Sequence, residues 1–189
     1  MYRCSSAPWP TSLVVVSALG TAVLVGAGFA AAQAIPHGTR APFAETFGTL
    51  VAFVPPLIAI GALLFVVRSY EVGPGELRVG RLLWTTRIDL AGLSRARHDP
   101  SAMTCSFRIF GNGGLYSFTG LYQSKALGRY RAYVTDPKRA VVLHLAGRTV
   151  VVSPDDPFTF LHQLRTFVPG VEIGGPQGVP FSLAPPPGA

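Results

Sequence analysis

The stretches LVVVSALGTAVLVGAGFAAAQA, residues 13–34, and FGTLVAFVPPLIAIGALLFVV, residues 47–67, decide the fold class of this chain. Neither contains Asp, Glu, Lys or Arg. Each is about twenty residues long, and at a rise of about 1.5 Å per residue this length matches the hydrocarbon core of a bilayer, roughly 30 Å. The sequence therefore predicts a two-helix transmembrane hairpin, with helices at about 12–34 and 47–68, inside a membrane anchor of residues 1–69.

Two features of these stretches allow a second interpretation. Pro55 and Pro56 remove backbone donors in mid-helix, which predicts a structural kink of a kind that membrane helices tolerate. The triplet Ala32-Gln33-Ala34 resembles a signal-peptidase site. Because the apolar run before it is longer than that of a usual signal peptide, we expect the first helix to be retained, with cleavage as the alternative.

The distribution of basic residues sets the expected sidedness. The linker, residues 36–46, contains one Arg and one Glu. Four arginines follow the second stretch within about twenty residues, the window over which the positive-inside bias acts: Arg68, Arg78, Arg81 and Arg87. We therefore expect a multi-pass protein of the cell (inner or plasma) membrane whose C-terminal domain is cytoplasmic.

From Tyr70 onward the hydrophobic pattern alternates, which is typical of half-buried strands. One alternating run carries Leu82, Trp84, Ile88 and Leu90. A second carries Met103, Cys105, Phe107 and Ile109, and in it we expect Cys105 to be a small buried residue. Further strands are expected at 116–122, 131–135, 140–145 and 149–152. The short connections contain Asp, Pro and Gly, which favour tight turns, so the strands are expected to form an antiparallel meander.

One helix is expected after the strands. Ser153 supplies an N-cap hydroxyl, Pro154 suits the first helical position, and Asp155 and Asp156 suit the first turn. An apolar face at helical spacing follows, made of Phe158, Leu161, Leu164 and Val168 with Phe160 and Phe167 beside them. The tail, residues 169–189, is rich in Pro and Gly and is expected to be disordered.

Three segments in this order resemble the membrane-linked bacterial pleckstrin-homology (PH)-like family: GRYRAYVTD (128–136), AVVL (140–143) and VVSPDDP (151–157). The resemblance covers about residues 70–168. It implies an α+β, mainly β fold: a PH-like antiparallel β-barrel of seven strands, split or closed, with one C-terminal capping helix. This fold is a scaffold for binding lipids, peptides or proteins, and it implies no settled activity. Eukaryotic relatives bind phosphoinositides through a Lys and Arg cluster on the first hairpin; here the lysines are missing, so that specificity is not carried over.

Other chemistry is not indicated by the residues. The histidines, at 37, 98, 144 and 162, lack zinc-site spacing, and His98-Asp99 has no marked nucleophile to activate. The glycines around Asn112 lack the lysine of a phosphate loop and predict a turn. Cys4 and Cys105 cannot form a disulfide framework. Aromatic residues interleave with Lys125, Arg129 and Arg131 as is normal for strands of a small barrel. We therefore expect no enzyme, no cofactor, no metal and no nucleic-acid partner.

Two functions remain after these exclusions. The favoured one is a membrane-anchored, non-catalytic interaction or self-association module on the cytoplasmic face, with a protein partner or a second copy of the chain. The alternative is a binder of anionic lipid head groups, for which each basic residue near the surface is worth about 1 kcal/mol. The residues expected to carry binding are Arg78, Arg81, Arg87, Arg95 and Arg97. A single membrane-facing patch of these arginines would favour the lipid alternative.

Overall fold

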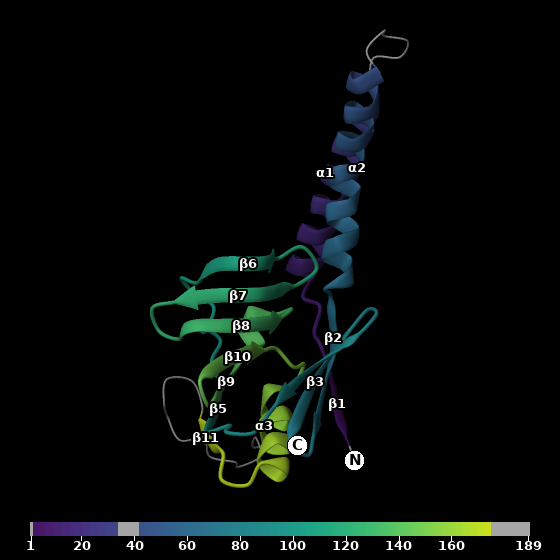
Figure 1. The fold of residues 1–189 in the computed structure, drawn as a ribbon. Helices are drawn as coiled ribbons and strands as arrows, with labels where there is room; N and C mark the ends of the chain where they lie inside the picture. Colours follow the sequence, from purple (N-terminus) through teal and green to yellow (C-terminus); the bar gives the residue numbers. More distant parts are fainter. Residues whose placement is uncertain (1, 34–41, 175–189) are drawn as a thin grey trace.

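The computed structural model describes residues 2–33 and 42–174. Most of the linker and the tail beyond residue 174 lie outside the described residues, so the expectations for them stay untested. Two helices project from one end of a domain made of two sheets and a third helix (Figure 1). The helices are α1 (Thr11–Gln33), α2 (Pro42–Leu64) and α3 (Pro157–Phe167), with a 3-10 turn at Pro137–Arg139.

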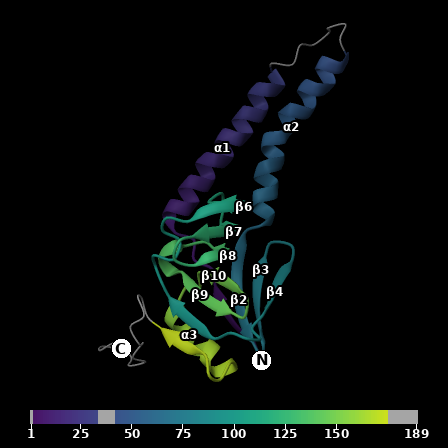
Figure 2. The same cartoon turned by 60° about the vertical axis from the view of Figure 1, so that its left-hand side comes forward.

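The two apolar segments form long helices, as predicted. By length and composition, Thr11–Gln33 and Thr46–Leu64 could each cross a membrane, and most of their residues are exposed, unlike those of a core helix. The helices approach closely at Gly28, where a Cβ would lie 2.9 Å from the Ala52 carbonyl oxygen and 3.1 Å from Pro56 Cδ. The pair runs side by side away from the domain (Figure 2). The second helix ends at Leu64 rather than residue 68, because the chain enters a strand at Val67.

The first sheet contains a strand that the sequence analysis missed. Its order is β1-β2-β3-β4, all antiparallel, with bounds Arg3–Ser6, Val67–Gly73, Glu76–Arg81 and Thr85–Asp89. β1 comes from the segment before α1, and Arg3 pairs with Val72 while Ser6 pairs with Ser69. The helical hairpin is thus inserted between two adjacent strands of one sheet, which places the start and the end of the hairpin at the same end of the domain.

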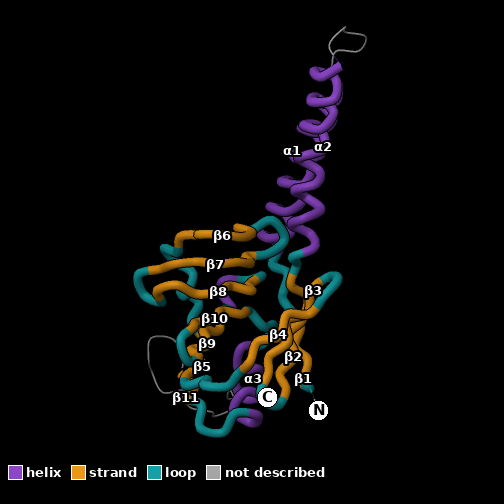
Figure 3. The backbone as a smooth tube through the Cα atoms, viewed as in Figure 1, coloured by secondary structure: helices purple, strands orange, loops and turns teal. Residues whose placement is uncertain are grey.

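The second sheet has the order β11-β5-β9-β10-β8-β7-β6. The bounds are β5 Arg95–His98, β6 Phe107–Gly113, β7 Phe118–Ser124, β8 Gly128–Val134, β9 Val141–Leu145, β10 Arg148–Val152 and β11 Glu172–Gly174. Most pairs are antiparallel, as expected, but β10 with β8 and β11 with β5 are parallel and depart from a meander. The β9–β10 hairpin turns the chain back, so that β10 runs in the direction of β8 and docks beside it. The two sheets remain separate (Figure 3), and a closed barrel is not confirmed.

The main core lies between the sheets and is covered by α3. Tyr70, Leu77, Leu143, Phe160 and Leu161 are almost fully buried there, which confirms Leu161 as a core residue. The helix begins later than expected, because Asp156 rather than Ser153 caps it and Pro157 takes the first position. Asp156 accepts the backbone N–H groups of Phe158 and Thr159.

Two other expectations from the alternating pattern are wrong, and the C-terminal tail is ordered further than its composition predicts. Cys105 is exposed and adopts a positive φ of 55°, because residues 100–105 form turns and the strand starts only at Phe107. Leu82 and Trp84 lie in the β3–β4 turn and are 39% exposed each. The tail is ordered as far as Gly174, since Glu172–Gly174 adds a strand beside Arg95–Arg97.

Candidate functional site

A cavity of about 580 Å³ lies where the second helix meets the domain. One wall comes from the end of α2 and the residue that follows it: Ile58, Gly61, Ala62 and Phe65. The opposite wall is the face of β6, β7 and β8 that carries Phe110, Leu121 and Tyr133. Its volume falls in the range of small-molecule sites, about 300–1,000 Å³.

Glycines keep this cavity open. Gly111 and Gly120 face each other in the β6–β7 register, and both line the cavity. Their φ values are 116° and 142°, and a Cβ on either would collide with the backbone of the other strand. The cluster of glycines around Asn112 therefore does more than form the predicted turn. Because the two strands meet without side chains at this point, space is left between the sheet and α2.

Three arginines from three different strands reach the cavity: Arg81, Arg108 and Arg131. Arg81 is the most constrained. Its Nε donates to Thr86 Oγ1 at 3.0 Å, and an Nη donates to the Phe65 carbonyl oxygen at 3.1 Å. Its Cζ also lies 5.3 Å from the ring centroids of Phe65 and Tyr133, within the range of cation–π attraction. The guanidinium is thus held between the end of α2 and the sheet.

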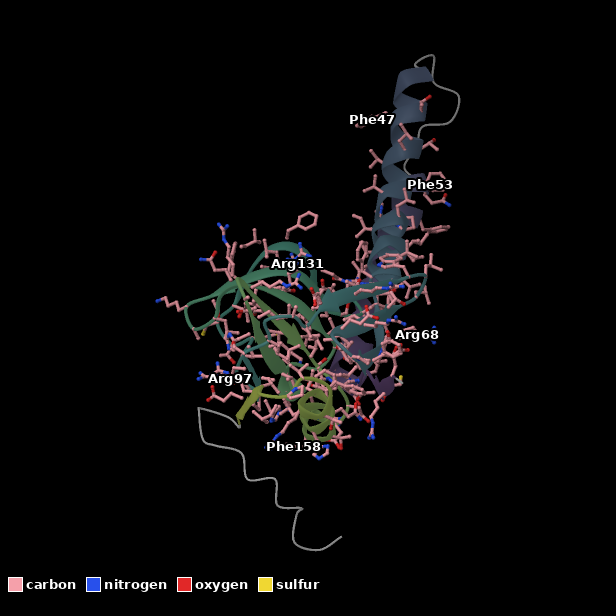
Figure 4. All side chains as sticks on the ribbon, turned by 60° about the horizontal axis from the view of Figure 1, so that its bottom comes forward. Phe47, Phe53, Arg68, Arg97, Arg131 and Phe158 are labelled. Carbon is pink, nitrogen blue, oxygen red and sulfur yellow. The ribbon has the colours of Figure 1, made fainter. Side chains whose placement is uncertain are left out.

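The other two arginines complete the basic lining. Arg131 lies on β8 directly opposite Leu121 of β7, and it is exposed, although the residues on either side of it are buried. The Arg108 guanidinium lies against Gly113, where any side chain would displace it. Figure 4 places Arg131 on the part of the domain nearer the long helices, and Arg97 and Phe158 toward the other end.

The cavity is electrostatically positive. None of its lining residues is Asp or Glu, and within the described part of the chain no ion pair involves Arg81, Arg108 or Arg131. Burial lowers the pKa of Arg81 below its ordinary value. An arginine pKa starts so high that the guanidinium still keeps its charge at neutral pH. Three charged guanidinium groups without a neighbouring acid thus lie beside an apolar helix, an arrangement whose chemistry suits an anion that carries an apolar part.

The five arginines singled out from the sequence do not form one patch. Arg78 is paired with Glu76 at 2.6 Å, and its Cζ lies 4.0 Å from the ring centroid of Tyr2. Arg87 faces Arg78 across the β3–β4 register. Arg95 and Arg97 lie on β5 in the other sheet, where they pair with Glu172 and Asp99. Of the five, Arg81 alone lines the cavity.

Sequence reasoning missed Arg108 and Arg131 as site residues. In the sequence both are polar members of alternating runs, and Arg131 belongs to one of the segments that carry the family resemblance. No spacing in the sequence joins them to Arg81, because the three come together only when β8, β6 and the end of β3 are folded around the end of α2.

The loop between β6 and β7 attaches the sheet to the first helix. The Tyr116 backbone N–H donates to Ser17 Oγ at 2.8 Å, and the Tyr116 hydroxyl lies 2.5 Å from Thr21 Oγ1. Asn112 closes this loop through hydrogen bonds with the backbone of Leu115. The wall of the cavity formed by β6 and β7 is therefore held in place by α1 as well as by its neighbouring strands.

The domain that carries β2 to α3 matches a known family. A family model described as Bacterial PH domain matches residues 68–167, from the start of β2 to the end of α3. The chain belongs to the bacterial PH domain family. Comparisons with curated proteins and with solved structures found no match. β1, both long helices and β11 lie outside the part of this bacterial PH domain protein that the family model covers.

The histidines are placed apart in the bacterial PH domain. Among the described residues no group of three or more His, Cys, Asp or Glu side chains could hold a metal ion. His98 Nε2 lies 3.3 Å from the Lys138 carbonyl oxygen, and its ring packs edge-on against Phe158. The Asp99 carboxylate instead accepts from Ser101 and pairs with Arg97. His98 and Asp99 are thus engaged with different neighbours. His37 lies outside the described residues.

Proposed function

We propose that this protein is a membrane-anchored, non-catalytic bacterial PH domain that binds an anionic, phosphate-bearing lipid in the cavity between α2 and β6–β8. In this proposal the domain is on the cytoplasmic face of the cell membrane. The observation that carries it is the meeting of three acid-free arginines with the apolar end of a candidate membrane-spanning helix.

The two walls of the cavity suit the two parts of a lipid. Ile58, Ala62 and Phe65 provide apolar contact for acyl chains that lie along α2. Arg81, Arg108 and Arg131 provide the charge and the planar donors that bind phosphate oxygens well. The partial burial of Arg81 strengthens its attraction to an anion, because fewer water molecules screen the charges.

Lipid binding was the alternative function expected from the sequence, but the arginines proposed here to bind the lipid are different, apart from Arg81. The first hairpin is a poorer anion site than expected, because Glu76 already neutralises Arg78 and hydrogen-bonds it at 2.8 Å. Arg95 and Arg97 are likewise beside acids. The interaction or self-association module remains a second proposal, for which the described residues supply no specific contact.

The test compares lipid selectivity of the full chain in phosphatidylcholine nanodiscs. Spin-labelled phosphatidylglycerol and spin-labelled phosphatidylcholine are added separately, and the immobilised fraction of each is measured by electron paramagnetic resonance. We expect the wild type to favour phosphatidylglycerol. Replacing Arg81, Arg108 and Arg131 together by glutamine should abolish the preference, since a basic residue at the surface is worth about 1 kcal/mol, or about fivefold in affinity.

Two matched variants separate the cavity from general electrostatics. The first variant replaces three arginines outside the cavity by glutamine: Arg95, Arg148 and Arg165. It removes the same amount of charge as the cavity variant and should keep the preference for phosphatidylglycerol. Arg78 and Arg87 replaced by glutamine tests the first hairpin and should also keep it. Addition of glycerol phosphate in excess should not displace the labelled lipid, because it lacks the chains. Equal loss in the cavity variant and the matched triple variant would refute the proposed site.

A further inference from the structure

The exposed apolar side chains of the domain are concentrated at the end where the long helices leave. In the β3–β4 turn, Leu83 is 72% exposed, and in β6, Phe107 is 73% and Phe110 79% exposed. Leu82, Trp84 and Ile109 beside them are also exposed. Figures 1 and 2 show β6 as the strand of its sheet nearest the long helices, with α3 at the opposite end of the domain. We call the six residues 82–84, 107, 109 and 110 the apolar rim.

The length of α2 sets the depth of β6. The apolar part of this helix, Thr46–Leu64, contains 19 residues and spans about 28 Å at 1.5 Å per residue, barely the thickness of a hydrocarbon core. A membrane-spanning α2 therefore has to keep its last turns within the bilayer. Ile58, Gly61 and Ala62 from those turns line the same cavity as Phe110 of β6. The β6 side of the domain consequently lies at the level of the membrane surface or below it.

Hydrogen bonds to α1 independently indicate that the β6 side of the domain lies close to the membrane. Tyr116, in the loop that follows β6, is hydrogen-bonded to Ser17 and Thr21. Thr21 is ten residues beyond the start of α1 at Thr11, which corresponds to about 15 Å along a helix. The loop therefore lies beside the apolar segment of α1 rather than beside its first turn. The turn at residues 82–84 is also near the exit of α2, since the Phe65 and Trp84 rings are 5.2 Å apart.

The unpaired backbone groups of β6 limit how deeply the apolar rim can enter the membrane. β6 is the last strand of its sheet in the described part of the chain, so one edge of it has no paired neighbour. Unpaired N–H and C=O groups are too costly in hydrocarbon but are solvated among head groups. Trp and other aromatic side chains favour this interfacial layer, where an apolar ring and nearby water are both accommodated.

We propose that the apolar rim inserts into the interfacial layer of the leaflet next to the domain, so that the bacterial PH domain lies against the lipid surface at two places, β6 and the β3–β4 turn. The occupant of this exposed surface is the bilayer itself. Phe110 belongs both to the rim and to the cavity wall, but Leu83 and Phe107 do not line the cavity, so they test this contact separately from lipid binding by the arginines.

The test measures the depth of single tryptophans in the full chain reconstituted in vesicles. Trp9 and Trp84, the two tryptophans of the chain, are first replaced by phenylalanine. Leu83→Trp and Phe107→Trp then place one probe on each part of the rim, and Phe158→Trp places a control on α3. Emission is recorded in phosphatidylcholine vesicles and in vesicles whose acyl chains are brominated near the head group.

We expect both rim probes to show blue-shifted emission and to lose most of their intensity in the brominated vesicles. The Phe158→Trp control should emit as an exposed tryptophan with little quenching. Adding the glutamine substitutions at Arg81, Arg108 and Arg131 should leave the quenching unchanged, whatever those substitutions do to lipid selectivity. Quenching of the rim probes no greater than that of the control would overturn the proposal. Blue-shifted emission that bromine does not quench would also overturn it, since protein would then cover the rim.

Discussion

Tyr70 joins the two sheets through a buried hydroxyl, and Tyr70→Phe tests that connection. The hydroxyl donates to the Tyr133 carbonyl oxygen at 2.6 Å and accepts the Ser153 backbone N–H at 3.2 Å. Tyr70 is on β2, whereas Tyr133 is near the end of β8 and Ser153 directly follows β10. The ring stays in place after substitution, so no large cavity forms and the two buried backbone groups lose a partner.

The expected loss of stability follows from the two backbone groups that lose the Tyr70 hydroxyl. A buried polar group left without a partner costs about 1–3 kcal/mol, so Tyr70→Phe should lower the free energy of unfolding by about 2–6 kcal/mol. Tyr122→Phe is the matched control. It removes one hydrogen bond, to the Asn112 carbonyl oxygen at 2.6 Å in a partly buried setting, and should cost about 0.5–1.5 kcal/mol.

The assay is urea unfolding of the full chain in detergent micelles, followed by near-ultraviolet circular dichroism of the tyrosines. This signal reports the PH domain, because the apolar helices stay within the micelle. A loss for Tyr70→Phe below about half a kcal/mol, or one no larger than that of Tyr122→Phe, would refute the reasoning.

The same residue predicts a dependence on alkaline pH. Burial raises the pKa of Tyr70 from 10.0 to about 12. The folded protein therefore holds this proton more tightly than the unfolded chain, and the stabilisation is complete below about pH 10 and is lost as the pH rises through about 12. Tyr70→Phe should flatten the fall in stability over this window. Because burial also raises the pKa of Tyr122 to about 12, some of the fall should remain. An unchanged slope in the variant would contradict the assignment.

Two further predictions concern the hairpin and the first strand. In a chain whose Cys4 and Cys105 are replaced by serine, a cysteine at Thr39 should react with an impermeant reagent outside intact cells and one at Lys138 should not, because the basic residues after the second helix keep the domain inside; the reverse labelling pattern would overturn the orientation. Deletion of residues 2–6 should destabilise the domain by a few kcal/mol, at about 0.5–1.5 kcal/mol for each backbone hydrogen bond that β1 makes to β2, and unchanged urea unfolding would show that β1 contributes nothing.

The sequence by itself determined the features that arise from local composition and period. Two stretches without charge are long and apolar enough to cross a membrane as helices, and they form the long helices. Helical spacing in the last third identified Leu161 and Leu164 as core residues. Period-two runs located β7 to β10 within a few residues. In each case the signal lies within one segment, because a helix or strand exposes its own apolar face in its own sequence.

Tertiary structure alone decided the features that depend on distant partners. Arg3–Ser6 has no apolar alternation and becomes a strand because β2 offers it an edge. Phe107 and Ile109 alternate like core residues but remain exposed, since period shows that one face is apolar and not what covers it. Arg81, Arg108 and Arg131 lie far apart in the sequence and meet beside α2. Period and composition carry no information on which strands become neighbours, and the residues that line the cavity are determined by which strands are neighbours.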